Sequence, residues 1–199
     1  EATVRLRGLP EAFSAVIATF PSVEKAGEAV FEIIRSGLDP AALELLAQEC
    51  IALINEEKNF ALEVSPTLFM EFHGATTGQL EETMEMVREI CQAQGCTDFR
   101  PGVGRKERDQ LWAARHELGE MIVRKHPDRS HTVIDVAVPI SAYPEIIALA
   151  REESRRVGIP GYTFSHAGDG NLHLVFMGKK GDPEEWVRIE KANERMVKK

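Results

Sequence analysis

Two histidines with metal-ligand chemistry lie near the end of the chain, in the run His166-Ala-Gly-Asp-Gly-Asn-Leu-His173. Within it, Asp169-Gly170 is typical of a two-residue hairpin turn, because both positions tolerate positive φ. About that turn the two histidines are predicted to be directly opposed, with Cβ atoms roughly 4.5–5.5 Å apart on one face. Two imidazoles at that separation can bind one divalent metal ion, so the run predicts a metal site. The alternative is a tight hairpin whose histidines are ordinary polar side chains.

A catalytic zinc usually has three protein ligands and one open position, and His166 and His173 supply two. No third ligand stands out by its spacing, so we expect it from an acid elsewhere in the fold or from beyond Lys199. Asp135 could accept a hydrogen bond from a metal-bound imidazole and fix its tautomer, or it could be a solvated side chain. Asn171 is a second candidate for such support, although an Asn beside a turn is most simply explained by bonds to its own backbone.

A buried arginine is the second feature that could bind a ligand. In the helix predicted over residues 105–126, Arg115 shares the apolar stripe of Leu111, Leu118 and Ile122. A guanidinium on a buried face keeps its charge and must find an anion. That anion could be an Asp or Glu of the protein, which the spacing alone favours, or the carboxylate of a small ligand bound in a bidentate manner.

Composition excludes several classes of protein. The chain has 199 residues and a net charge of −8, which argues against nucleic-acid binding because phosphates require a basic surface. No apolar stretch approaches the roughly 18–20 residues of a membrane span, and no secretory segment opens the chain. The three cysteines have no zinc-finger spacing, so we expect free thiols in a reducing compartment. We therefore expect a cytoplasmic protein, either free or peripheral to the inner membrane.

Strand and helix patterns alternate along the chain. Strands are predicted over 13–20, 67–74, 97–100 and 132–139, and helices over 23–35, 79–94, 105–126 and 141–157. Pro40 suits a first helical position, and the apolar residues Leu43, Leu46, Cys50, Leu53 and Ile54 predict a helix after it. The order predicts an α+β fold, with a ferredoxin-like antiparallel sheet and helices packed on one face. No Gly-rich strand–turn–helix typical of dinucleotide binding is present.

The two ends have the appearance of cut ends. Residues 3–6 alternate as a strand does, directly at the start, and the chain stops at Lys199 inside a charged helical pattern that has no cap. We therefore expect the chain to be a piece of a longer protein.

Four segments together resemble the C-terminal domain of FAD-linked oxidases of the vanillyl-alcohol oxidase type. The run from His166 to His173 is similar to the family's H-x-G-D-G-N-x-H motif. The segments 68–74, 111–116 and 135–141 resemble the branch that contains D-lactate dehydrogenase (cytochrome) and the flavin subunit of glycolate oxidase. Residues 1–10 resemble the end of the FAD-binding domain, and residues 11–199 the substrate-binding domain, truncated at its C-terminus.

This resemblance implies roles for the matched residues. His166 and His173 would bind zinc or manganese, and Arg115 would bind the substrate carboxylate, which reverses the preference that the spacing gives. FAD would be bound mainly by the domain that precedes this chain. In the family, a Glu-His pair nearer the C-terminus supplies a third metal ligand and a base. The chain ends before that motif, so no catalytic residue is assigned within it, and we expect it to be inactive alone.

The resemblance implies an FAD-dependent dehydrogenase that oxidises a small D-2-hydroxy acid, in the first place D-lactate to pyruvate. Its electron acceptor is not identified by the sequence. Two alternatives stay open: the flavin subunit of a glycolate oxidase, and a non-catalytic ferredoxin-like module that binds a metal or a small ligand.

Overall fold

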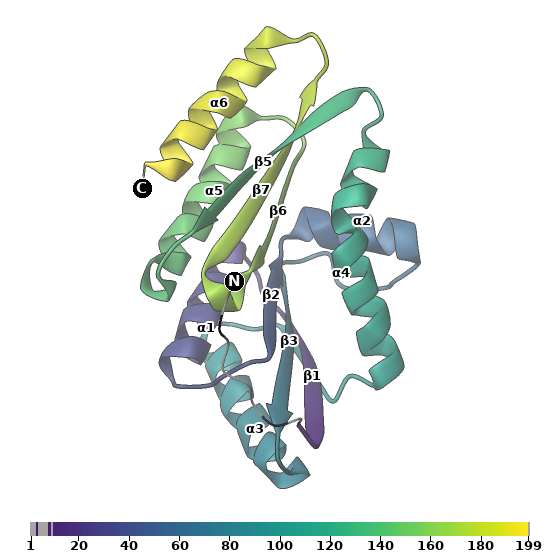
Figure 1. Ribbon diagram of the computed structural model, residues 1–199, viewed down its shortest axis with the longest axis vertical. Helices are drawn as coiled ribbons and strands as arrows, with labels where there is room; N and C mark the ends of the chain where they lie inside the picture. The colour runs from purple at the N-terminus through teal and green to yellow at the C-terminus, as the bar shows by residue number, and fades with distance from the viewer. Residues whose placement is uncertain (1–2, 4–7, 9, 199) are drawn as a thin grey trace.

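The computed structural model describes residues 3, 8 and 10–198, in which strands and helices alternate (Figure 1). The strands are β1 (Ala12–Thr19), β2 (Ala42–Leu46), β3 (Thr67–Gly74), β4 (Asp98–Pro101), β5 (Arg129–Ala137), β6 (Gly161–His166) and β7 (Asn171–Lys179). The helices are α1 (Val23–Arg35), α2 (Gln48–Lys58), α3 (Thr77–Ala93), α4 (Arg105–Lys125), α5 (Tyr143–Val157) and α6 (Pro183–Val197). Two short 3₁₀ turns, η1 (Ile140–Ala142) and η2 (Ala167–Asp169), complete the described elements.

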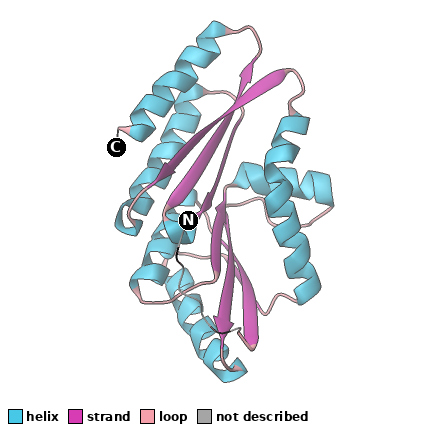
Figure 2. Ribbon diagram, in the orientation of Figure 1, coloured by secondary structure: helices cyan, strands magenta, loops and turns pink. Residues whose placement is uncertain are grey.

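All the strands belong to one antiparallel sheet, in the order β4-β1-β3-β2-β6-β7-β5. The pairings β1–β3 and β5–β7 are long, whereas β2 and β6 pair through Glu44↔His166, Leu45↔Ser165 and Leu46↔Phe164. The α+β class with an antiparallel sheet is therefore as predicted (Figure 2).

Helices cover both faces of this sheet. We call the face under α1, α3, α5 and α6 the first face, and the face under α2 and α4 the second face (Figure 1). Each face has its own apolar core, because alternate side chains of the strands point to opposite sides. The sequence analysis placed the helices on one face. The structure adds α2 and α4 to the other because both carry a buried apolar stripe of their own.

Helix ends follow the local sequence. The side chain of Ser22 accepts a hydrogen bond from the Lys25 N–H at the start of α1, and Asp182 does the same for the first turn of α6, where Pro183 occupies the first position. Helix α5 ends at Val157, and Gly158 caps it with φ 67°. These boundaries agree with the sequence patterns.

The helix predicted from Pro40 is wrong over its first half. Residues Ala42–Leu46 form the central strand β2, and the helix begins only at Gln48. A short apolar run fits strand and helix equally well, and here the tertiary context decides. Leu43 and Leu45 enter the first core and Leu46 the second, as expected for a strand buried on both faces.

Two further expectations concern the ends and the membrane. Residues 4–6 of the strand predicted at the N-terminus lie outside the described residues, so the assignment of residues 1–10 stays a prediction. Within the described part of the chain, no helix combines the length and the apolar character needed to cross a bilayer.

Candidate functional site

His166 and His173 lie side by side on the second face of the sheet. Their ring centroids are 5.5 Å apart, and the ring planes are nearly perpendicular, at 89°. The His166 side chain is half exposed, whereas that of His173 is 17% exposed. The proximity predicted from the sequence is therefore present in the fold.

The turn that joins these histidines differs from the prediction. Gly170 closes η2 by donating its N–H to the Ala167 carbonyl at 3.1 Å, so residues 167–170 connect the strands in place of a two-residue Asp-Gly turn. As a result His173 is opposite Phe164, and His166 is opposite Glu44 of β2. Relative to the predicted hairpin, in which His166 is opposite His173, the register is shifted by two residues. A shift of two keeps every side chain on its own face, which is why the histidines still meet.

Glu44, a residue that the sequence analysis did not select, bonds to two of the predicted site residues. Its Oε1 atom is 2.6 Å from Nδ1 of His166. Its Oε2 atom accepts a hydrogen bond of 2.8 Å from Nε of Arg115. The Glu44 side chain is buried. An acid flanked by leucines on both sides, as in Leu43-Glu44-Leu45, is the sequence signal that could have identified it, since buried acids are rare unless paired.

Arg115 is buried on the apolar stripe of α4, as its spacing predicts. Its guanidinium carbon lies 4.7 Å from the centroid of the Phe164 ring, and its Nη2 atom is 2.8 Å from Oε2 of Glu44. The same Nη2 atom is buried and makes no hydrogen bond of acceptable geometry within the described residues. Arg115 thus has a protein carboxylate as partner, yet keeps hydrogen-bonding capacity that Glu44 does not satisfy.

Asp135 and Asn171 lie near His173, and Asp135 belongs to β5, the strand that pairs with β7 on the side away from β6. Asp135 is opposite His173 in the β5–β7 register, with its Oδ1 atom 3.3 Å from Nδ1 of that histidine. The amide of Asn171 donates to the same Oδ1 atom at 2.8 Å. Burial lowers the pKa of His173, and the nearby Asp135 carboxylate opposes that shift. A neutral imidazole is the form that binds metal ions.

The arrangement can be tested against the requirements of a metal site. An ionised carboxylate can only accept, so the hydrogen bond between Glu44 and His166 places the proton of that imidazole on Nδ1 and leaves its Nε2 to bind a metal. For His173, Asp135 is an ion-pair contact of 3.3 Å to Nδ1. No group of three or more His, Cys, Asp or Glu side chains that could hold a metal ion occurs among residues 3, 8 and 10–198. The histidine pair therefore fits two positions of a metal site, and the described residues supply no third.

A second polar cluster on the same face repeats this pattern. On β3, the buried Glu71 lies 2.6 Å from Nε2 of His73, and it accepts hydrogen bonds from Arg108 at 3.0 Å and from Trp112 at 3.2 Å. Both donors come from α4, the helix that carries Arg115. The sequence predicts the strand and the helix that carry these residues but not their contact.

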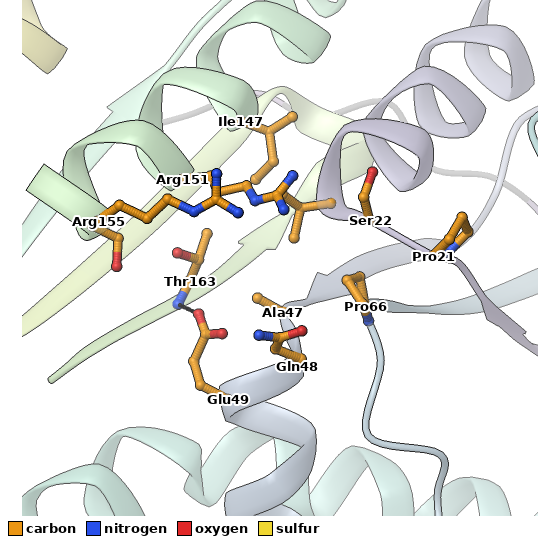
Figure 3. A pocket seen from close by; sticks show the side chains of 12 residues that line it. Pro21, Ser22, Ala47, Gln48, Glu49, Pro66, Ile147, Arg151, Arg155 and Thr163 are labelled. Atoms are coloured by element: carbon orange, nitrogen blue, oxygen red, sulfur yellow. Dashed lines mark hydrogen bonds between the residues drawn. The ribbon is translucent and has the colours of Figure 1, made fainter.

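Two hollows flank these elements. A groove of about 570 Å³ lies between α4 and the strands β5 and β7, and Phe164, Val133 and Val175 are among its lining residues. A smaller cavity of about 160 Å³ lies between α1, α2 and α5, lined by Glu49, Thr163 and Arg151 among others (Figure 3). Phe164, which contacts both Arg115 and His173, lines the groove, but His166, His173 and Arg115 themselves line neither hollow.

Comparison with protein families gives one match over nearly the whole chain. The family described as FAD linked oxidases, C-terminal domain, matches residues 9–199. Among curated proteins, the probable mitochondrial D-lactate dehydrogenase of Danio rerio is 33% identical over 199 residues, which is all of this chain and 40% of that protein. The glycolate oxidase subunit GlcD of Escherichia coli K12 is 29% identical, over 99% of this chain and 39% of that protein.

Solved structures share the fold at lower identity. The 4-ethylphenol oxidase from Gulosibacter chungangensis superposes with a TM-score of 0.63 and 16% identity, over 95% of this chain and 44% of that one. An alkyldihydroxyacetonephosphate synthase also superposes at 0.63, with 13% identity, over 96% of this chain and 40% of that one. At such identities the likeness concerns the fold alone. The chain spans about 40% of the length of these relatives.

Proposed function

Because this chain belongs to the C-terminal domain family of FAD linked oxidases, we propose that it is the substrate-binding domain of an FAD-dependent dehydrogenase that oxidises D-lactate to pyruvate. The observation that carries the proposal is the convergence of Arg115, His166 and His173 on one side of the sheet, linked by Glu44. The relative from Danio rerio, whose name gives D-lactate dehydrogenase, supports the choice of substrate.

Arg115 binds the substrate carboxylate in this proposal. Its Nη2 atom lacks a hydrogen bond in the described structure, and its planar guanidinium suits a carboxylate. Phe164 stacks against the guanidinium and limits its orientation. Phe164 gives an apolar surface beside the guanidinium against which a short aliphatic side chain such as the methyl group of lactate packs in this proposal.

His166 and His173 hold a divalent metal, zinc or manganese, through their Nε2 atoms. Such an ion, when bound, makes the substrate hydroxyl more acidic while FAD accepts the hydride. Glu44 keeps the proton of His166 on Nδ1, Asp135 lies beside Nδ1 of His173, and the Asn171 amide donates to Asp135. The third ligand and the base come from outside the described residues.

The proposal also assigns FAD and substrate to different domains of one enzyme. FAD is bound mainly by a domain that precedes this one, with residues 1–10 at its end and residues 11–199 forming the domain that binds substrate. The share of about 40% that the chain covers in its relatives supports this division. The partners of the domain are thus the FAD-binding domain of the same chain and a small 2-hydroxy acid.

Steady-state oxidation by the full-length protein tests the proposal. D-lactate, L-lactate and glycolate are compared with a dye as electron acceptor, after a flavin absorbance spectrum has been recorded. We expect bound flavin and the highest kcat/KM for D-lactate. A preference for glycolate would favour the alternative that the Escherichia coli relative suggests, and oxidation of none of the three would refute the proposal. The 199-residue chain alone should bind no stoichiometric FAD, and tight binding would contradict the division into domains.

A further inference from the structure

Glu44 connects two groups that a 2-hydroxy acid dehydrogenase must hold in fixed relation. It is the central residue of β2, directly opposite His166 on β6, and its side chain points to the second face. One oxygen contacts Nδ1 of His166 at 2.6 Å, and the other accepts from Nε of Arg115 at 2.8 Å. A single buried carboxylate therefore sets the position of both an imidazole and a guanidinium.

The two contacts require two acceptors, which only a carboxylate provides. Nε of Arg115 is always a donor, and Nδ1 of His166 must donate for Nε2 to keep its lone pair for a metal. An amide of the same shape has one acceptor and one donor. It either donates to Nδ1, which moves the His166 proton to Nε2, or turns its NH₂ group toward the guanidinium, where two donors meet.

The contact of Glu44 with His166 is also shorter and more buried than the contact of Asp135 with His173. Asp135 lies 3.3 Å from Nδ1 of His173 and its side chain is 59% exposed, whereas Glu44 lies 2.6 Å from His166 with 9% exposed. A buried, charge-assisted hydrogen bond restricts a ring more than an exposed contact of that length. His166 itself is half exposed, so its orientation depends on this bond.

We propose that Glu44 is a positioning residue that couples the carboxylate-binding Arg115 to the metal-binding His166, so that substrate and metal are held in one geometry. This proposal rests on the function proposed above. Glu44 contacts neither substrate nor metal and acts through the two residues it joins.

The chain offers a matched control in the cluster around Glu71. Glu71 is equally buried, it bonds to a histidine at 2.6 Å and it accepts from an arginine of the same helix α4 at 3.0 Å. Its histidine, His73, has no second histidine beside it in the ring contacts of the described residues. Glu71→Gln therefore makes the same chemical change on the same face, at a carboxylate whose hydrogen bonds go to His73, Arg108 and Trp112 and not to His166 or Arg115.

The experiment compares Glu44→Gln, Glu71→Gln and wild type in the full-length protein. Affinity for Zn²⁺ alone is measured by competition with a fluorescent chelator after metal removal, and kcat and KM are measured with the preferred 2-hydroxy acid. For Glu44→Gln we expect Zn²⁺ affinity to fall by about 10–100-fold and KM to rise by about 10-fold or more. Glu71→Gln should leave Zn²⁺ affinity and KM within about twofold of wild type.

A second variant covers the case in which Glu44→Gln does not fold. Glu44→Asp keeps a negative charge beside Arg115 but is shorter by one methylene, so it cannot reach both partners. We expect a folded protein with reduced Zn²⁺ affinity and a raised KM.

Wild-type Zn²⁺ affinity in the folded Glu44 variants would overturn the proposal. So would an equal loss in Glu71→Gln, because it would indicate general destabilisation, and so would a wild-type protein that does not bind Zn²⁺. A wild-type protein that oxidises no 2-hydroxy acid would instead refute the proposed function, and the Zn²⁺ comparison would still decide the role of Glu44.

Discussion

Replacement of Gly170 by alanine tests how the connection between the two histidines is held. Gly170 adopts φ 71°, and a Cβ built there would lie 2.1 Å from the carbonyl oxygen of Val138. The carbonyl of Gly170 also accepts a hydrogen bond of 3.0 Å from the Val138 N–H. An alanine must therefore adopt a strained conformation and push the loop away from the end of β5.

The expected loss of stability has two parts. The left-handed conformation costs a residue with a Cβ roughly 1–2 kcal/mol. Displacement of the loop breaks the hydrogen bond with Val138, at about 1 kcal/mol. A total of about 2–3 kcal/mol corresponds to a fall in Tm of roughly 4–12 °C for a chain of this size.

Urea denaturation followed by fluorescence of Trp112 and Trp186 measures this loss. Gly37→Ala is the control, because Gly37 has φ 80° and a Cβ there would meet no atom within 4 Å. We expect Gly37→Ala to cost roughly 1–2 kcal/mol. If Gly170→Ala costs no more than Gly37→Ala, the loop is not packed against Val138 and the reasoning is refuted.

Three further predictions concern Arg115, Glu49 and the thiols. Arg115→Lys in the full-length protein keeps the charge but loses the planar fork, so KM for the 2-hydroxy acid should rise by about 10-fold or more. Unchanged kinetics would contradict the role of Arg115 in substrate binding. Burial raises the pKa of the Glu49 carboxyl above its ordinary value of 4.5 (Figure 3). Its contribution to stability is therefore present below that value and is lost as pH rises through the folded-state pKa. Glu49→Gln should raise the urea midpoint at about pH 7.5 and leave it nearly unchanged at about pH 4, and a lower midpoint at pH 7.5 would contradict this. Burial also raises the pKa of Cys91 to about 12 and raises the pKa of the less buried Cys96. A thiol reagent should therefore modify Cys96 first. Mass spectrometry that finds Cys91 modified first would contradict the packing.

Long periodic segments were predictable from the sequence. The helix that became α4 shows its apolar stripe and the buried Arg115 directly, and its bounds differ from the prediction by one residue. The face of β5 that carries Asp135 follows from strict alternation. In such segments many residues repeat one pattern, so local sequence and tertiary packing agree.

Short segments inside the sheet were not predictable in the same way. The segment Ala42–Leu46 is five residues long, and its leucines satisfy helical spacing as well as strand alternation. Its assignment to a helix hid Glu44, because only the pairing with β6 brings this residue opposite His166. The histidine pair was nevertheless found with the wrong turn, since its position depends on the parity of the register and not on the length of the loop.

The pairing of β2 with β6 has a mechanical consequence. β2 and β6 join through three residue pairs, fewer than the five between β2 and β3 and the four between β6 and β7 on either side. This short pairing lies in the middle of the described sheet, and Glu44↔His166 is an outermost pair of it. Both apolar cores continue across this pairing, so they hold the two halves of the sheet together where the strand pairing is shortest. The distance between Glu44 and His166 therefore depends on the packing of both cores as well as on the strand pairing.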